Sequence, residues 1–328
     1  MASLVVCGAI NWDITCFVEK LPSPGEEVPV RRVQRVSGGT AGNVAVAAAR
    51  ILGRGAVALL GALGDDDIGS QQIAALEAEG VVTDGIRKVS GMHSGQAYIL
   101  VDDRGENIIA TSLGANAALR AMGLIARDID RLLHGCRAIA ITDPPLEVVE
   151  ALVLLAQERG IPSLWDPGVL LADHSGALSS MTCRVDTLFC NEVEAAALFN
   201  STEPDVVLKH VSRLGFRNQV VMKLGSRGAA LLEPATRKVV ETPALPLDRL
   251  GMQVVGTVGC GDAFVGAFAA YRILEADSAK ALLMASVAAG LNATRQETRG
   301  SPDRATLEMV QQRACKIGYS LRRRSASE

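Results

Sequence analysis

The sequence contains few aromatic residues and few histidines, and it lacks two common phosphate-binding motifs. Its 328 residues include 2 Trp, 3 Tyr and 6 Phe, so there are few side chains on which a base could stack. The 7 cysteines form no Cys-x-x-Cys pair and there are only 4 histidines, which argues against a zinc site. Neither G-x-x-x-x-G-K-[ST] nor G-x-G-x-x-G occurs, which excludes a P-loop and the usual dinucleotide fingerprint.

Neither charge nor hydropathy indicates a nucleic-acid or membrane partner. The net charge is −3 at pH 7, which argues against a nucleic-acid-binding protein. No apolar run is long enough to span a bilayer, and the apolar residues 1–10 lack the basic flank of a signal peptide. We therefore expect a cytoplasmic protein with reduced cysteines. The only basic run, residues 322–324, lies in a Ser-rich tail that we expect to be frayed.

Alanine, valine, leucine and glycine dominate the chain, in segments that alternate between strand-like and helix-like patterns. This alternation predicts right-handed crossovers and helices packed on a parallel sheet. The strands are predicted at residues 4–9, 56–61, 138–142, 162–165, 185–190 and 219–224. The main helices are predicted at residues 44–52, 146–159, 262–274, 279–294 and 303–318.

Two segments do not fit this alternation. Residues 14–18 and 28–36 look like short strands around a Pro-Gly turn, and residues 95–102 and 106–111 look like a hairpin. These strands are too short and too polar for the main sheet. We therefore expect two inserts, at approximately 14–36 and 95–112, that form a small β-sheet lid.

The clearest chemical signal is the stretch 256–264, Gly-Thr-Val-Gly-Cys-Gly-Asp-Ala-Phe. It follows the β-prone pair Val254 and Val255 and leads into a helix. Glycines at such a junction let the backbone approach a ligand closely, and the first turn of a helix offers N–H groups that bind an anion, most naturally a phosphate. Asp262 beside this anion hole could be a general base for a hydroxyl that attacks a phosphoryl group. It could also be a helix N-cap, which is a common role for Asp.

The stretch resembles the C-terminal signature of the PfkB/ribokinase family of carbohydrate and nucleoside kinases, D-T-x-G-A-G-D. Cys260 replaces the usual Ala, and Gly256 replaces the first Asp. In relatives that Asp helps to bind a monovalent cation. Residues 294–302 occupy the place of the family's second cation-site loop, and Arg299 stands there where small residues are common. Gly256 and Arg299 therefore argue against an ordinary potassium site. The resemblance implies that Asp262 is the catalytic base. It also implies that an anion hole is formed by the N–H groups of Gly259, Cys260 and Gly261.

Further motifs extend the resemblance over nearly the whole chain. Residues 37–43 resemble the family's N-terminal G-G signature, residues 191–194 its N-x-x-E motif, and residues 223–228 its K-x-G-x-x-G turn. In the family, the Glu of N-x-x-E acts through water on Mg²⁺, which implies this role for Glu194. The implied acceptor-binding residues are Asn11, Asp13, Gly38, Gly39, Thr40, Asn43 and Asp143. The implied nucleotide-binding residues are Asn191, Lys223, Gly225, Arg227, Gly228 and Thr257.

Simpler interpretations of these residues remain open. Asn191 with Glu194 could be a helix cap with an acidic first turn, and Arg227 could be a solvated side chain. Asp143 could cap a turn after its strand.

We therefore predict one PfkB-type kinase domain over residues 1–328, with a ribokinase-like, Rossmann-type three-layer α/β/α core and a small β lid. The implied reaction transfers a phosphoryl group from ATP, with Mg²⁺, to an alcohol of a sugar such as ribose. The alternatives are a nucleoside kinase of the same family and a catalytically silent sugar- or nucleotide-binding regulator. Lid strands with exposed edges predict a homodimer.

Overall fold

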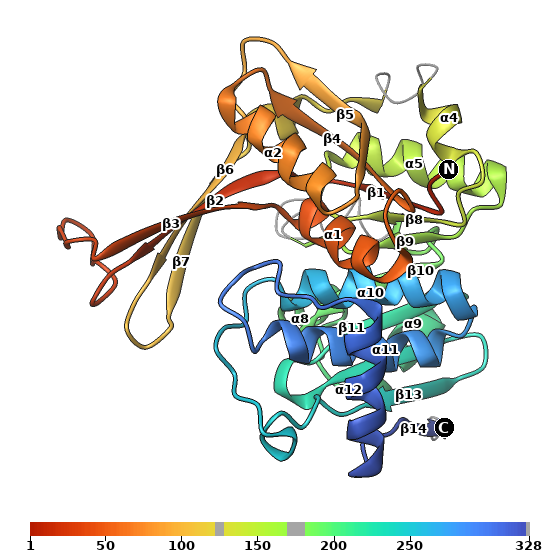
Figure 1. Ribbon diagram of the computed structural model, residues 1–328. Coiled ribbons are helices and arrows are strands. Elements are labelled where there is room, and N and C mark those ends of the chain that lie inside the picture. The colour runs from red at the N-terminus through yellow and green to blue at the C-terminus, as the bar shows by residue number, and fades with distance from the viewer. Residues whose placement is uncertain (122–127, 169–180, 326–328) are drawn as a thin grey trace.

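A ten-stranded β-sheet forms the centre of the molecule (Figure 1). The computed structural model describes residues 1–121, 128–168 and 181–325. The strands of the central sheet are β1 (Leu4–Cys7), β4 (Val57–Gly64), β5 (Val82–Val89), β8 (Ala138–Ile141), β9 (Ser163–Trp165), β10 (Thr187–Asn191), β11 (Gln219–Lys223), β12 (Ala229–Glu233), β13 (Lys238–Thr242) and β14 (Arg322–Ser325).

The spatial order of the sheet is β14-β13-β12-β11-β10-β9-β8-β1-β4-β5. All pairs from β11 to β5 are parallel, as the alternation of strands and helices predicts. The pairs β11–β12, β12–β13 and β13–β14 are antiparallel. The expectation of a purely parallel sheet is therefore wrong at this edge, where short turns connect β11, β12 and β13.

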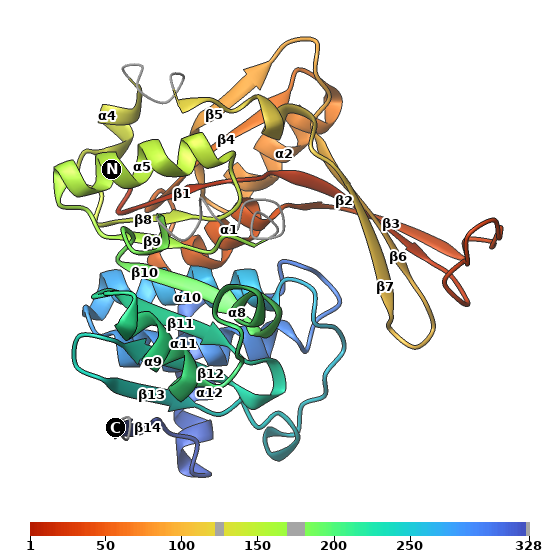
Figure 2. The same ribbon diagram turned by 180° about the vertical axis from the view of Figure 1, so that it is seen from behind.

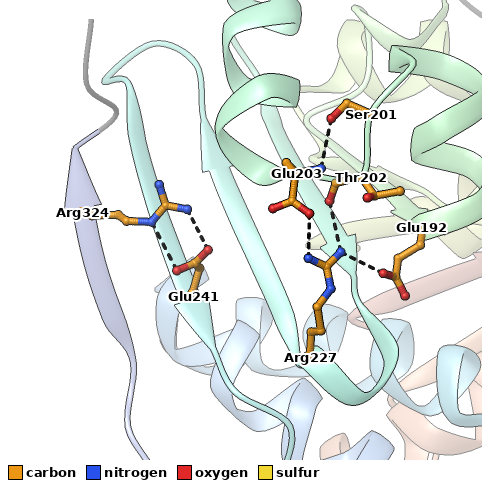
Figure 3. A network of polar contacts seen from close by, with 7 residues as sticks. All are labelled: Glu192, Ser201, Thr202, Glu203, Arg227, Glu241 and Arg324. Carbon is orange, nitrogen blue, oxygen red and sulfur yellow. Dashed lines mark hydrogen bonds and ion pairs between the residues drawn. The ribbon is translucent and has the colours of Figure 1, made fainter.

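The C-terminal tail ends in an ordered strand, so the prediction of frayed residues at 322–324 is wrong. β14 pairs with β13. The guanidinium of Arg324 donates to Glu241 at 2.8 Å (Figure 3) and also pairs with Asp205. These contacts hold the C-terminal segment in place. The segment has too few apolar side chains for hydropathy to predict its position.

Helices cover both faces of the central sheet (Figures 1 and 2), which confirms the predicted three-layer α/β/α core. On β1, Leu4 and Val6 point into one core, and Val5 and Cys7 point into the other. One face carries α1 (Thr40–Leu52), α2 (Asp67–Ala78), α10 (Cys260–Glu275), α11 (Ser278–Asn292) and α12 (Arg304–Lys316). The other face carries α4 (Asp128–Leu133), α5 (Leu146–Arg159), α8 (Glu192–Phe199) and α9 (Pro204–Arg213). Short 3₁₀ helices are η1 (Gly114–Ala118), η2 (Gly225–Arg227) and η3 (Asp248–Leu250).

A second, four-stranded sheet projects from the body (Figure 1). Its order is β3-β2-β6-β7, and we call it the small sheet. The predicted inserts 14–36 and 95–112 both lie in it, whereas its action as a lid stays a prediction. β2 begins at Asn11, so Asn11 and Asp13 lie in the small sheet. Its strands are β2 (Asn11–Phe17), β3 (Arg32–Gly38), β6 (Gly95–Val101) and β7 (Asn107–Ser112).

Helices α1 and α10 pack closely because small residues face each other at their contact. A Cβ added at Gly266 of α10 would lie 2.6 Å from the carbonyl oxygen of Val44 and 2.8 Å from the Cβ of Ala47. Residues four apart share a helix face. The contact between Gly266 and Ala47 therefore brings Asp262 and Asn43, each one turn earlier, to the same place.

Among the helices of the described segments, none has both the length and the apolar character that crossing a bilayer requires.

Candidate active site

The candidate residues gather at the carboxyl ends of the central strands. Asp143 follows β8, Asp166 follows β9, and Asn191 and Lys223 are the last residues of β10 and β11. The first turn of α10 lies at the same edge, and in open α/β sheets this edge is where ligands bind. The sheet thus brings together chemical groups that are far apart in the sequence.

The start of α10 has the geometry of an anion hole. The N-cap is Gly259, with φ of 77°, and a Cβ there would lie 2.1 Å from the carbonyl oxygen of Thr298. The first i→i−4 bond of the helix runs from the N–H of Ala263 to Gly259, so the N–H groups of Gly261 and Asp262 precede it. The N–H of Cys260 donates to Thr257 at 3.3 Å.

Two expectations about this stretch are wrong. Asp262 is not the N-cap of α10, because Gly259 holds that position and Asp262 lies within the first turn. Val254 and Val255 do not form a strand; they lie exposed in an irregular segment whose N–H groups at 255 and 256 donate to the carbonyl of Ala293. The junction is thus a loop-to-helix turn, held by the end of α11.

The carboxylate of Asp262 is held by an amide. The Nδ2 of Asn43 donates to its Oδ2 at 2.7 Å. Burial raises the pKa of Asp262 to about 6, while Asn43 and the ammonium of Lys223 lower it. The carboxyl group is therefore mostly ionised at neutral pH and has a much higher proton affinity than a solvated aspartate, which suits a general base.

Asp13 lies beside this pair and is buried. A Cβ at Gly38 would lie 2.1 Å from its Oδ2, so the carboxylate rests directly on the glycine backbone. Burial raises the pKa of Asp13 to about 7; the guanidinium of Arg299 opposes this rise and the carboxylate of Asp262 adds to it. At Gly39, φ is 84° and a Cβ would lie 2.3 Å from the backbone nitrogen of Asn11, so only glycine fits there.

Further polar side chains are prearranged around Asn11 and Asp143. Asn116 donates to the Oδ1 of Asn11 at 2.9 Å and accepts from the N–H of Ile10 at 3.0 Å. Asp143 accepts from the N–H of Ala9 at 3.1 Å and from the hydroxyl of Thr40 at 3.2 Å. Asp143 thus connects β1, α1 and β8, in addition to any ligand contact.

Lys223, whose charge also acts on Asp262, pairs with Asp166, and their Nζ and Oδ2 are 2.5 Å apart. Burial lowers the pKa of Lys223, but Asp166 and Glu194 outweigh burial and raise it. The Nζ of Lys223 also lies 3.8 Å from the position that a Cβ would take at Gly261. A phosphoryl group at the start of α10 would therefore be a neighbour of Lys223.

Asn191 and Glu194 form a capping box at the start of α8. The N–H of Glu194 donates to Asn191 at 2.9 Å, and the N–H of Asn191 donates to Oε2 of Glu194 at 2.8 Å. The helix-cap interpretation is therefore confirmed. Binding of Mg²⁺ by Glu194 stays a prediction. Because Oε2 accepts the cap hydrogen bond, Oε1 is the oxygen left for the ion.

Arg227 is exposed at the surface, and its guanidinium points toward acidic side chains (Figure 3). Its guanidinium pairs with Glu192 at 2.8 Å and with Glu203 at 2.9 Å. Gly225 and Gly228 flank it in the turn between β11 and β12, and Thr257 is exposed at the start of the anion hole. Nucleotide binding by these four residues stays a prediction.

Three residues with prominent contacts were given no site role from the sequence: Arg299, Asn116 and Asp166. The Nε of Arg299 donates to Oδ1 of Asn43 at 2.9 Å, and its Nη2 donates to the carbonyl of Gly38 at 3.1 Å. The glycine at position 42 is needed for this contact, since a Cβ there would lie 2.6 Å from Nη2 of Arg299. The sequence shows the glycine but not its distant partner, so local patterns could not predict the contact.

Comparison with known protein families shows to which family the chain belongs. The model for the pfkB family carbohydrate kinases matches residues 1–304. The chain belongs to this family and is a kinase. The kinase is 31% identical over 302 residues to the ATP-dependent ribose-1-phosphate kinase of Halopiger xanaduensis, covering 92% of this chain and 95% of that one. It is 29% identical over 280 residues to a ribokinase of Schizosaccharomyces pombe, covering 82% and 84% of the two chains.

A solved structure of Arabidopsis thaliana ribokinase, complexed with ribose and ATP, has the same architecture as this sugar kinase. The TM-score is 0.80 at 26% sequence identity, and the match covers 95% of this kinase and 99% of the other chain. The ribokinase-like fold is thereby confirmed.

Proposed function

We propose that this kinase transfers the γ-phosphoryl group of ATP to the hydroxymethyl group of ribose or a closely related pentose. The observation that carries the proposal is the 2.7 Å hydrogen bond from Asn43 to Asp262. It joins the acceptor-side motif at the start of α1 to the anion hole at the start of α10. The two relatives named above, an ATP-dependent ribose-1-phosphate kinase and a ribokinase, support a pentose as the acceptor.

Asp262 is the general base of this reaction. Its carboxylate takes the proton of the acceptor hydroxyl as that oxygen attacks the γ-phosphorus and the bond to the leaving ADP breaks. The N–H groups at residues 259–261 donate to the charge that develops on the transferred group. Because the N–H of Cys260 already contacts Thr257, the strongest donors here are those of the free first turn, Gly261 foremost.

Asn11, Asp13, Asn43 and the backbone of Gly39 hold the acceptor. Sugar hydroxyls both donate and accept hydrogen bonds, and this set offers carboxylate acceptors together with amide donors. Gly38, Thr40 and Asp143 complete the proposed acceptor site. Thr40 donates to Oδ2 of Asp143 at 3.2 Å and the N–H of Ala9 donates to its Oδ1 at 3.1 Å, so a ligand would share oxygens that already accept hydrogen bonds.

The carboxylates around Lys223 fit a magnesium ion that accompanies the nucleotide. The Oδ1 of Asp166 is buried and has no hydrogen-bond partner among the described residues, and Glu194 faces the same ammonium. Carboxylate oxygens are the ligands that Mg²⁺ uses beside phosphates. Bound there, Mg²⁺ would neutralise charge on the phosphates; Asp166 and Glu194 would hold it directly or through water.

For the nucleotide, we assign contacts to Asn191, Lys223, Gly225, Gly228 and Thr257. Lys223 supports this assignment best, because it lies beside Gly261. Arg227 would first have to release Glu192 or Glu203.

A nucleoside is the second candidate acceptor, and two aromatic residues of the small sheet could serve its base. Alternation along β2 puts Trp12 on the opposite face from Asp13. The guanidinium of Arg32 already stacks on the ring of Phe17, with its Cζ 3.8 Å from the ring centroid, so one face of this ring is not open to a base. Both observations favour the sugar over the nucleoside.

We also expect a homodimer in the cytoplasm, with the small sheet as the contact. Its strands β6 and β7 expose the apolar side chains of Tyr98, Ile108 and Ile109, and its edge strands offer backbone groups for pairing. Sedimentation of wild type against Ile109→Glu tests this: the variant should be monomeric, and unchanged sedimentation at a dimer's mass would exclude this surface.

The decisive experiment measures initial rates with ATP for ribose, ribose phosphates, fructose and ribonucleosides, using wild type and Asp262→Asn. We expect turnover with a pentose or pentose phosphate, a loss of ~10²–10⁴ in the variant, and nucleotide binding nearly unchanged. Turnover of a hexose alone would refute the acceptor assignment. A variant within a few-fold of wild type would refute the role of Asp262, and the absence of any turnover would favour the silent regulator.

A further inference from the structure

Arg299 is a partly exposed residue in the loop between α11 and α12, and its guanidinium extends to the start of α1. It donates from Nε to Oδ1 of Asn43 at 2.9 Å and from Nη2 to the carbonyl of Gly38 at 3.1 Å. Both acceptors are neutral oxygens, so Arg299 is not merely half of an ion pair. Its guanidinium contacts the same amide that holds Asp262.

The two contacts of Asn43 determine the orientation of its amide. A guanidinium has only donors and a carboxylate has only acceptors. The amide oxygen must therefore face Arg299, and the NH₂ group must face Asp262. Without Arg299, the amide could rotate, and its oxygen could accept a proton from a neutral Asp262. With Arg299, Asn43 can only donate to Asp262, which favours the ionised carboxylate.

We infer that Arg299 is a positioning residue for phosphoryl transfer: through Asn43 it holds Asp262 as an oriented carboxylate. Asn43 binds Oδ2, whereas Oδ1 accepts no hydrogen bond from the described residues and is left for the proton of the acceptor hydroxyl. The inference rests on the proposed role of Asp262 as the general base.

Neighbouring residues leave space for the extended side chain of Arg299 and hold the backbone of its loop. Gly42 leaves the space for the guanidinium, since a Cβ there would lie 2.6 Å from Nη2. The backbone of the loop is held by Arg50, which donates to the carbonyls of Arg299 and Ser301 at 2.7 and 2.6 Å. Arg50 in turn pairs with Glu79 at 2.6 Å. The loop, α1 and α2 are thus fixed together around one side chain.

The test uses two variants that remove the contact in different ways. Arg299→Met keeps most of the apolar stem but removes the donors. Gly42→Ala keeps the charge but places a methyl group 2.6 Å from the present position of Nη2, so the guanidinium must move; alanine is favourable within a helix. Arg295→Met, at an exposed arginine of the same loop, is the control.

We expect kcat to fall about tenfold to a hundredfold in Arg299→Met and Gly42→Ala, and the acid limb of the kcat profile to move up by roughly one pH unit. Other charges face these groups but are unchanged by the variants: Lys223, Asp166 and Asp143 around Asp262, and Asp13, Glu79 and Arg50 around Arg299. Changes at Asp13 would appear in the KM of the acceptor rather than in kcat. Arg295→Met should match wild type, and Arg299→Lys, which keeps a donor, should recover part of the rate.

Several results would overturn the inference. If both variants stay within about twofold of wild type, or lose rate with an unmoved acid limb, Arg299 has only a structural role. If Arg299→Met does not fold, Gly42→Ala decides alone. An Asp262→Asn variant with near-normal turnover would instead overturn the proposed function itself, so the two failures are distinct.

Discussion

The amide of Asn43 hydrogen-bonds to the carboxylate of Asp262 at 2.7 Å, although 219 positions separate them in the chain. The bond exists because α1 and α10 approach each other through Gly266 and Ala47, each one helical turn beyond the bonded residue. Motifs near the two ends of the chain therefore form one site. The geometry of the proposed site thus depends on a helix contact that contains none of the proposed site residues.

The pH profile of wild type should report the environment of Asp262. The base must be ionised, so kcat should fall below pH about 6, where the buried carboxyl takes up a proton. The measurement is kcat at saturating acceptor and nucleotide from pH 5 to about 9. A kcat that stays constant down to pH 5, as expected for a solvated aspartate with a pKa of about 4, would show that burial does not control this carboxyl group.

Gly266→Ala should impair both stability and turnover. The added Cβ would meet the backbone of Val44 at 2.6 Å, and backbone cannot move aside as a flexible side chain can. Overpacking costs ~1–3 kcal/mol, which exceeds the gain of up to about 1 kcal/mol in helix propensity. Separating the helices should also reduce kcat about tenfold or more, measured well below the unfolding temperature. An unchanged kcat would show that the distance between α1 and α10 is not critical.

Much of this site was predictable from local sequence. The start of α10 and the capping box of α8 follow from residue types at short spacing, and the alternation of strands and helices predicts the central sheet. The ordered strand β14 was not predictable, because it depends on ion pairs of Arg324 with distant acids. The same holds for Arg299, whose partners lie more than 250 positions away. Local propensity carries no information about such contacts.

Potassium should activate this kinase weakly or not at all. Gly256 has no carboxylate to offer, and a Cβ there would lie 3.5 Å from the carbonyl oxygen of Arg295. Gly256→Asp would place a carboxylate beside that carbonyl and should introduce potassium dependence. Rates in potassium and sodium salts at equal ionic strength check both statements. Strong, saturable potassium activation of wild type would mean that other groups form a cation site.

Glu194→Gln should raise the Mg²⁺ concentration needed for half-maximal rate. Glutamine at this position can still form the capping box with Asn191, so the variant removes charge while helix α8 is retained. Glu192→Gln, two residues earlier and paired with Arg227 at the surface, is the matched control and should titrate as wild type does. An identical Mg²⁺ titration for all three proteins would leave Glu194 with its capping role alone.

Asp13→Asn should stabilise the protein at alkaline pH while impairing acceptor binding. Asp13 has a pKa of about 7 in the folded protein and about 4 in the unfolded chain. Between these values the folded state binds more protons than the unfolded state, so stability falls as pH rises through this window. At pH about 8 the variant, which has no carboxylate at position 13, avoids this loss of stability. Each kcal/mol gained in the free energy of unfolding raises Tm by ~2–4 °C.

At acidic pH, near the lower end of that window, Asp13 is protonated in the folded state and the gain should nearly vanish. Asp103→Asn, at an exposed carboxylate that pairs with Arg31, should change Tm little at either pH. Thermal unfolding of the three proteins at both pH values measures the effect, and the acceptor KM measures the accompanying loss of binding. Equal stabilisation at the two pH values would mean that the buried charge of Asp13 is not what opposes folding, and that this carboxylate is better solvated than its contact with Gly38 implies.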